Sequence, residues 1–101
     1  MSASTTNDED LFGRSVAASP DALMQQLPDD ELIFLNLRTE SYFALESTGA
    51  CMYRALIESP TIEKAHERLT SEFDAAPEQL RNDLLVLVHR LVDQGLLELS
   101  G

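Results

Sequence analysis

The chain has 101 residues, of which 44% are hydrophobic, and it carries 18 acidic against 7 basic side chains for a formal net charge of -11. This length allows one hydrophobic core rather than two, and the acidic balance argues against nucleic acid as a partner because like charges repel. With no run of 18 apolar residues to cross a bilayer, no secretory signal and a single cysteine, Cys51, the chain is expected to be cytoplasmic, without a membrane partner or an internal disulfide.

The start of the chain is polar and acidic. The first ten residues contain Asp8, Glu9 and Asp10 and lack the apolar side chains that a packed segment needs. We therefore predict a disordered acidic tail over residues 1–12 and a single domain over residues 13–101.

Three strands are predicted to follow. Ala22–Leu27 has the length and partial alternation of a strand, and Pro28-Asp29-Asp30 supplies a turn to a second strand at Leu32–Leu37. Four consecutive apolar residues open this second strand, which predicts a central strand covered on both faces. After a reversal at residues 38–41, Tyr42–Leu45 is predicted to form a third strand at the edge of the sheet.

Three helices are predicted after the strands. Ser47 is expected to cap the first helix, which stops at Ser59-Pro60, and Thr61 is expected to cap the second, which ends near Asp74. The third helix runs from Pro77, a favourable residue for a first helical turn, to a left-handed cap at Gly95. The last apolar residues either fold back on the core or form a short extended piece. The predicted fold class is therefore α+β, with a three-stranded antiparallel sheet followed by three helices.

The residues that usually carry chemistry form no recognisable site. The two histidines, His66 and His89, and Cys51 do not provide the close-spaced ligand pairs of a zinc site. The four glycines are isolated, so no phosphate-binding loop is present, and no nucleophile has an identifiable activating base. We expect a protein that is not an enzyme and that needs no cofactor or metal, with Cys51 acting as a small buried hydrophobe.

The third helix carries more apolar surface than one packed face requires. Leu85 and Val92 extend its apolar stripe beyond the positions that would bind the core. In one interpretation this helix is covered on two sides by its own domain. In the other, Leu85, His89 and Val92, with Arg81 at the edge, form one wall of a groove whose other wall is the third strand. A peptide pairing with Tyr42, Phe43, Ala44 and Leu45 would then gain main-chain hydrogen bonds from the strand and pockets from the helix.

The motif Tyr42-Phe43-Ala44-Leu45-Glu46-Ser47-Thr48-Gly49 is similar to the Tyr-Tyr-x-Leu-Asn-x-Thr-Gly signature of the PqqD-like family, with Glu46 replacing the usual Asn. The run from Leu35 to Ala50, the cap at Thr61 and the ending Gly95-Leu96-Leu97 extend the resemblance over roughly residues 20 to 99. Within this family the Tyr-Phe and Thr-Gly runs look closest to the stand-alone proteins of lasso peptide clusters.

The resemblance implies a winged-helix-like recognition element for ribosomally synthesised and post-translationally modified peptides (RiPPs). Such domains bind the leader of a precursor peptide antiparallel to the third strand and against the third helix. A maturation enzyme (a protease, cyclase or radical enzyme) modifies the core that follows. Carried onto this chain, Tyr42, Phe43, Ala44 and Leu45 would offer the strand edge. The helix wall of Arg81, Leu85, His89 and Val92 comes from periodicity.

Two alternatives remain open. A winged-helix DNA-binding regulator would have a similar helix order, but residues 77–95 carry three acidic side chains against Arg81 and Arg90, which does not favour a DNA-reading helix. A structural adaptor would pair with another chain through the same sheet edge. We expect the isolated chain to be a monomer or a weak dimer.

Overall fold

The computed structural model describes residues 11–100, apart from the side chain of Ser100. Its elements follow the order β1 (Ser15–Ala18), β2 (Ala22–Gln26), β3 (Leu32–Asn36), β4 (Ser41–Leu45), α2 (Ser47–Glu58), α3 (Ile62–Glu72), α4 (Pro77–Asp93) and β5 (Leu97–Ser100). The three-stranded antiparallel sheet followed by three helices is therefore confirmed, and each predicted element lies within two residues of its expected bounds.

The three-stranded sheet has the order β2-β3-β4, so β3 is central and both β2 and β4 are edge strands. In register, Phe34 of β3 lies opposite Met24 of β2 and Phe43 of β4. Two tight reversals connect the strands, and Asp30 and Glu40 each adopt a positive φ there, at 64° and 60°. Aspartate is several-fold enriched in this left-handed region, which fits Asp30, whereas glutamate has no such preference at Glu40.

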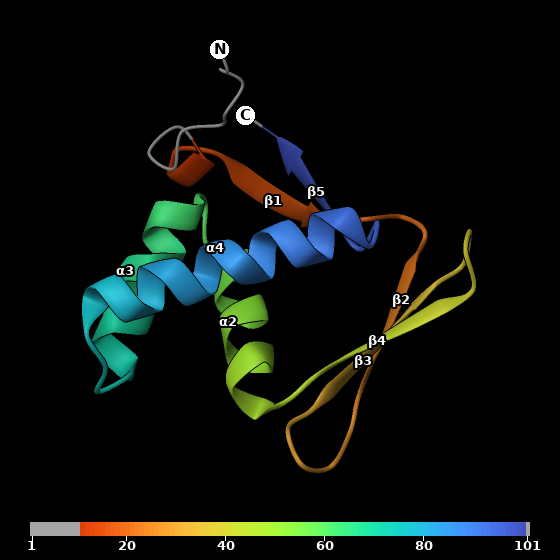
Figure 1. Ribbon diagram of the computed structural model, residues 1–101, viewed down its shortest axis with the longest axis horizontal. Coiled ribbons are helices and arrows are strands. Elements are labelled where there is room, and N and C mark those ends of the chain that lie inside the picture. The colour runs from red at the N-terminus through yellow and green to blue at the C-terminus, as the bar shows by residue number, and fades with distance from the viewer. Residues whose placement is uncertain (1–10, 101) are drawn as a thin grey trace.

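The described residues cover one face of this sheet and not the other, which corrects the expectation for β3. Leu32, Phe34 and Asn36 are buried on the helix side, whereas Ile33 and Leu35 point the other way and are half-buried. In Figure 1 the helices all lie to one side of the sheet, and no described element lies against its other side. The consecutive apolar residues of β3 therefore do not indicate two covered faces.

A second, two-stranded sheet pairs β1 with β5, with Val16 opposite Leu99. The short extended piece expected at the C-terminus is β5, but its partner β1 was not predicted. Residues 1–10 of the predicted tail lie outside the described residues. Leu11 and Phe12 are 1% and 3% exposed, so the tail prediction is wrong for these two residues.

The helices begin and end close to where the sequence placed them. Thr61 caps α3, since its hydroxyl accepts a hydrogen bond from the Lys64 backbone N–H at 3.1 Å. Gly95 adopts a φ of 73° beyond α4, as expected. The cap predicted for α2 is wrong, because Ser47 is already helical and Glu46 occupies the N-cap without a side-chain hydrogen bond.

One cluster of buried apolar side chains joins the helices to both sheets. Phe34 of β3 packs edge-on against Tyr53 of α2, with ring centroids 4.9 Å apart. Asn36, only 5% exposed, fastens the sheet to the end of α4: its side-chain amide donates to the Gln94 carbonyl at 2.8 Å. These contacts fix α4 relative to the sheet and so determine which of its faces lies near β4.

Candidate functional site

The outer side of β4 is a free strand edge. The backbone N–H of Leu27 donates to the Glu31 carbonyl, and the backbone N–H of Leu37 donates to the Asp21 carbonyl. Because these bonds flank β3, its odd-numbered residues form their backbone hydrogen bonds with β2 and its even-numbered residues form theirs with β4. By register, Ser41, Phe43 and Leu45 turn their backbone groups toward β3. Because backbone groups alternate along a strand, the N–H and C=O groups of Tyr42 and Ala44 point outward. Among the described residues no strand pairs with them.

A shallow cleft of about 250 Å³ lies beside the end of β4, between α2 and α4. It is mainly apolar, with one acidic and one basic side chain at its border. Its lining residues are Leu45, Thr48, Gly49, Met52, Asp83, Val86, Leu87 and Arg90. The cleft and the free edge share Leu45, so they form one continuous surface.

The close approach of β4 and α2 depends on a glycine. A Cβ placed on Gly49 would lie 3.2 Å from the Leu45 side chain, tighter than ordinary van der Waals contact. Gly49 therefore lets the first turn of α2 lie directly against the end of β4, which places Met52 at the floor of the cleft beside Leu45.

Arg90 connects the two walls of the cleft. Its guanidinium carbon lies 5.1 Å from the centre of the Phe43 ring, a cation–π distance. Val86, one turn earlier on α4, is 50% exposed, and Leu87 is 7% exposed and belongs to the core. Asp83 accepts hydrogen bonds from the Gln79 side-chain amide at 3.1 and 3.2 Å. The cleft thus presents an apolar floor between a carboxylate and a guanidinium.

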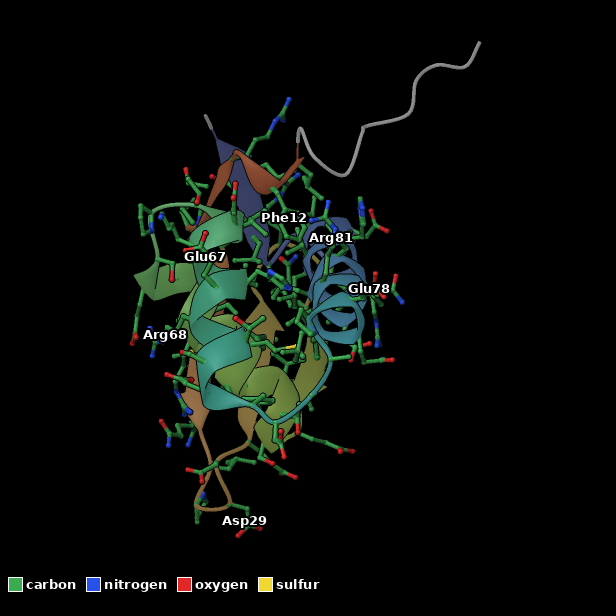
Figure 2. The ribbon with its side chains drawn as sticks, turned by 90° about the vertical axis from the view of Figure 1, so that its left-hand side faces the viewer. Phe12, Asp29, Glu67, Arg68, Glu78 and Arg81 are labelled. Carbon is green, nitrogen blue, oxygen red and sulfur yellow. The ribbon has the colours of Figure 1, made fainter. Side chains whose placement is uncertain are left out.

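The helix wall predicted from periodicity does not face this cleft. Leu85 is 8% exposed and is part of the core, so the interpretation as a core residue holds for it. The guanidinium of Arg81 stacks over the Phe12 ring at 4.2 Å, beside α3 (Figure 2). Val92 packs against the core and lines a separate polar cleft near β5, and His89 is exposed.

The predicted and observed walls occupy opposite flanks of α4. At about 100° per residue, Arg81, Leu85 and Val92 centre about 170° around the helix from Asp83, Val86, Leu87 and Arg90. The structure does place all four predicted strand residues on the edge strand β4, namely Tyr42, Phe43, Ala44 and Leu45. A sequence signal for the wall of the observed cleft existed in Val86, an apolar residue out of phase with the core positions.

Residue types that often carry chemistry also occur outside this cleft. The described residues contain no group of three His, Cys, Asp or Glu side chains placed to hold a metal ion. The His66 Nε2 lies 2.8 Å from the Pro77 carbonyl, and Cys51 is a half-buried free thiol packed against the core. Burial raises the pKa of the Tyr53 phenol above its usual value. No helix in the described part of the chain has the length and apolar character to span a membrane.

Comparison with known proteins gives consistent results. The family model for coenzyme PQQ synthesis protein D (PqqD) matches residues 31–97, which include the free edge and the whole cleft. Two solved structures have similar folds, each with a TM-score of 0.74. "TbiB1 in complex with the TbiA(beta) leader peptide" is 24% identical and aligns over 81% of this chain and 94% of its own. "Lasso peptide synthetase B1 complexed with the leader peptide" is 21% identical and aligns over 83% and 98%. No curated protein matches significantly.

Proposed function

The chain belongs to the PqqD family, and from that membership we propose that it is a non-catalytic recognition protein for the leader of a ribosomally synthesised precursor peptide. It would deliver the bound precursor to a modifying enzyme or protease. The observation that carries this proposal is the free edge of β4 running into the apolar cleft beside α4. The two solved relatives, both complexes with leader peptides, support the choice of ligand.

The free edge would supply affinity without regard to sequence. A leader lying antiparallel to β4 would exchange main-chain hydrogen bonds with Tyr42 and Ala44, whose N–H and C=O groups point outward. Each such bond contributes about 0.5–1.5 kcal/mol net. Since these bonds do not read side chains, specificity must come from elsewhere.

The cleft would supply that specificity. An apolar leader side chain fits between Leu45, Met52 and Leu87, where it would lose its contact with water. Arg90 and Asp83 at the border would favour neighbouring leader residues of opposite charge. Backbone pairing together with one or two buried anchors supports a Kd between about 10 nM and 10 μM, which is about -11 to -7 kcal/mol.

Precursor peptides are made on ribosomes, so this encounter is proposed to occur in the cytoplasm. The test is fluorescence anisotropy with a labelled synthetic leader, taken from a short reading frame beside this gene. A lasso precursor is the first choice because one of the similar structures is a lasso peptide synthetase subunit. We expect saturable binding in the stated range, and a scrambled leader should bind at least tenfold more weakly. An absence of saturation up to about 100 μM would exclude leader recognition.

A proline substitution tests the strand edge itself. Ala44→Pro removes an outward N–H and leaves the hydrogen bonds between β3 and β4 intact, because edge strands tolerate proline on their free side. We expect a folded protein with at least tenfold weaker leader binding. Met24→Pro is the matched control, since it removes an outward N–H from β2, the other free edge. Equal losses in both variants would argue against pairing at β4.

A further inference from the structure

The uncovered face of the three-stranded sheet is apolar and exposed. Its side chains come from all three strands and surround an open depression of about 300 Å³. Leu23 is 55% exposed and Tyr42 is 72% exposed, and Leu37, just beyond β3, is 50% exposed. We call this surface the open sheet face and define it by Leu23, Gln25, Ile33, Leu35 and Tyr42. A contiguous apolar surface on a soluble domain commonly marks an interaction site.

Leader binding as proposed above would leave this face free. Side chains alternate along a strand, so Phe43 and Leu45 point to the helix side of the sheet whereas Tyr42 points to the open sheet face. Tyr42 nevertheless offers its backbone at the free edge. A protein docked on the open sheet face would therefore lie directly beside the bound leader.

The segment that forms the three-stranded sheet and its turns is acidic. Residues 21–46 contain six acidic side chains and one basic side chain, Arg38, which gives this segment a net charge of -5 out of the total of -11. Arg38 lies 3.9 Å from Asp21, so its charge is partly matched within the chain. Asp29 stands at the tip of the turn between β2 and β3, away from the helices (Figure 2). The acidic residues of the segment are Asp21, Asp29, Asp30, Glu31, Glu40 and Glu46.

We propose that the open sheet face docks the enzyme that processes the bound leader peptide, and that this enzyme presents an apolar patch ringed by lysine and arginine. This inference rests on the proposed function. Charge complementarity selects such a partner, because basic side chains would be attracted to the acidic sheet segment while the apolar centres exclude water. A second copy of the chain is disfavoured, since it would bring a second charge of -11 to the same segment.

The test uses a purified processing enzyme encoded beside the precursor gene, and the enzyme is selected by the criterion that adding this chain accelerates its reaction on the precursor. Leu23→Lys places a positive charge on the open sheet face, at an exposed position of β2 that should not disturb folding. We expect the Kd for the enzyme to rise at least tenfold and processing to slow accordingly, while leader affinity stays within twofold. Raising the salt concentration from 50 to 500 mM should weaken the wild-type complex severalfold, because exposed charges are screened.

Ile57→Lys is the matched control, since Ile57 is 39% exposed on α2 and lies outside the open sheet face. It should change neither affinity. An unchanged enzyme affinity in Leu23→Lys would overturn the proposal. A second result would also overturn the proposal: light scattering that shows a dimer for the wild-type chain and a monomer for Leu23→Lys. In that case a second copy of the chain would occupy the open sheet face. If the wild-type chain binds no leader at all, the proposed function itself fails, and the direct leader titration separates that result from the others.

Discussion

Val86→Asp is the substitution that most directly tests the cleft beside β4. Val86 lies on α4 at the border of the cleft and is 50% exposed, so the isolated protein should tolerate a polar side chain there. A bound leader would cover the exposed half. The variant should therefore fold normally and bind the leader poorly.

The expected loss follows from burial and charge. Complete burial of a valine side chain contributes about 2 kcal/mol, so covering the exposed half of Val86 contributes about 1 kcal/mol. An aspartate there must be desolvated beside Asp83, three residues earlier on the same helix, which costs about 1–2 kcal/mol more. The sum of about 2–3 kcal/mol corresponds to a rise in Kd of about 30- to 160-fold.

Fluorescence anisotropy with the labelled leader measures this change, and circular dichroism checks the fold. Val92→Asp is the matched control because it makes the same change on the opposite flank of α4. It packs partly against the core and should lower thermal stability, but leader affinity should stay within twofold. A rise above tenfold in Val92→Asp with native circular dichroism, and none in Val86→Asp, would refute the observed cleft as the binding site.

Three further predictions concern stability. Gly95→Ala should lower the free energy of unfolding by about 2–4 kcal/mol in urea titrations, since the new Cβ at a φ of 73° would lie 2.7 Å from the Asn36 amide nitrogen; a loss below 0.5 kcal/mol would contradict this account. Thr61→Ala should cost about 1 kcal/mol by the same assay, because the Lys64 N–H loses its cap. Burial raises the folded-state pKa of Tyr53 above 10, so its protonated form adds stability that is complete below pH 10 and is lost as the pH rises through the folded pKa. Tyr53→Phe should remove that alkaline component, as pH-dependent unfolding would show.

Several features were predictable because their causes are local. A threonine before an amphipathic run predicts a helix start at Thr61, and a glycine after such a run predicts the left-handed cap at Gly95. The edge strand followed from the short Tyr42–Leu45 run and the absence of a later strand to pair with it. The resemblance to PqqD-like proteins agrees with the family match over residues 31–97.

Other features depend on residues distant in the sequence. β1 is only four residues long, and its partner β5 lies about 80 residues later, so no local pattern identified the pair. The burial of Leu11 and Phe12 has the same origin. Phe12 packs edge-on to His66 and beneath Arg81, and neither contact is visible in a stretch that resembles a polar tail.

The sequence by itself determined that α4 carries more apolar surface than a single face needs, but the tertiary structure decided which flank borders β4. Periodicity gives the angles between residues on one helix and leaves the rotation of that helix against the sheet undefined. Here that rotation is fixed by long-range contacts, namely Asn36 with Gln94 at one end of α4 and Arg81 with Phe12 nearer the other. These contacts turn Val86 and Arg90 toward the strand edge and Val92 away from it.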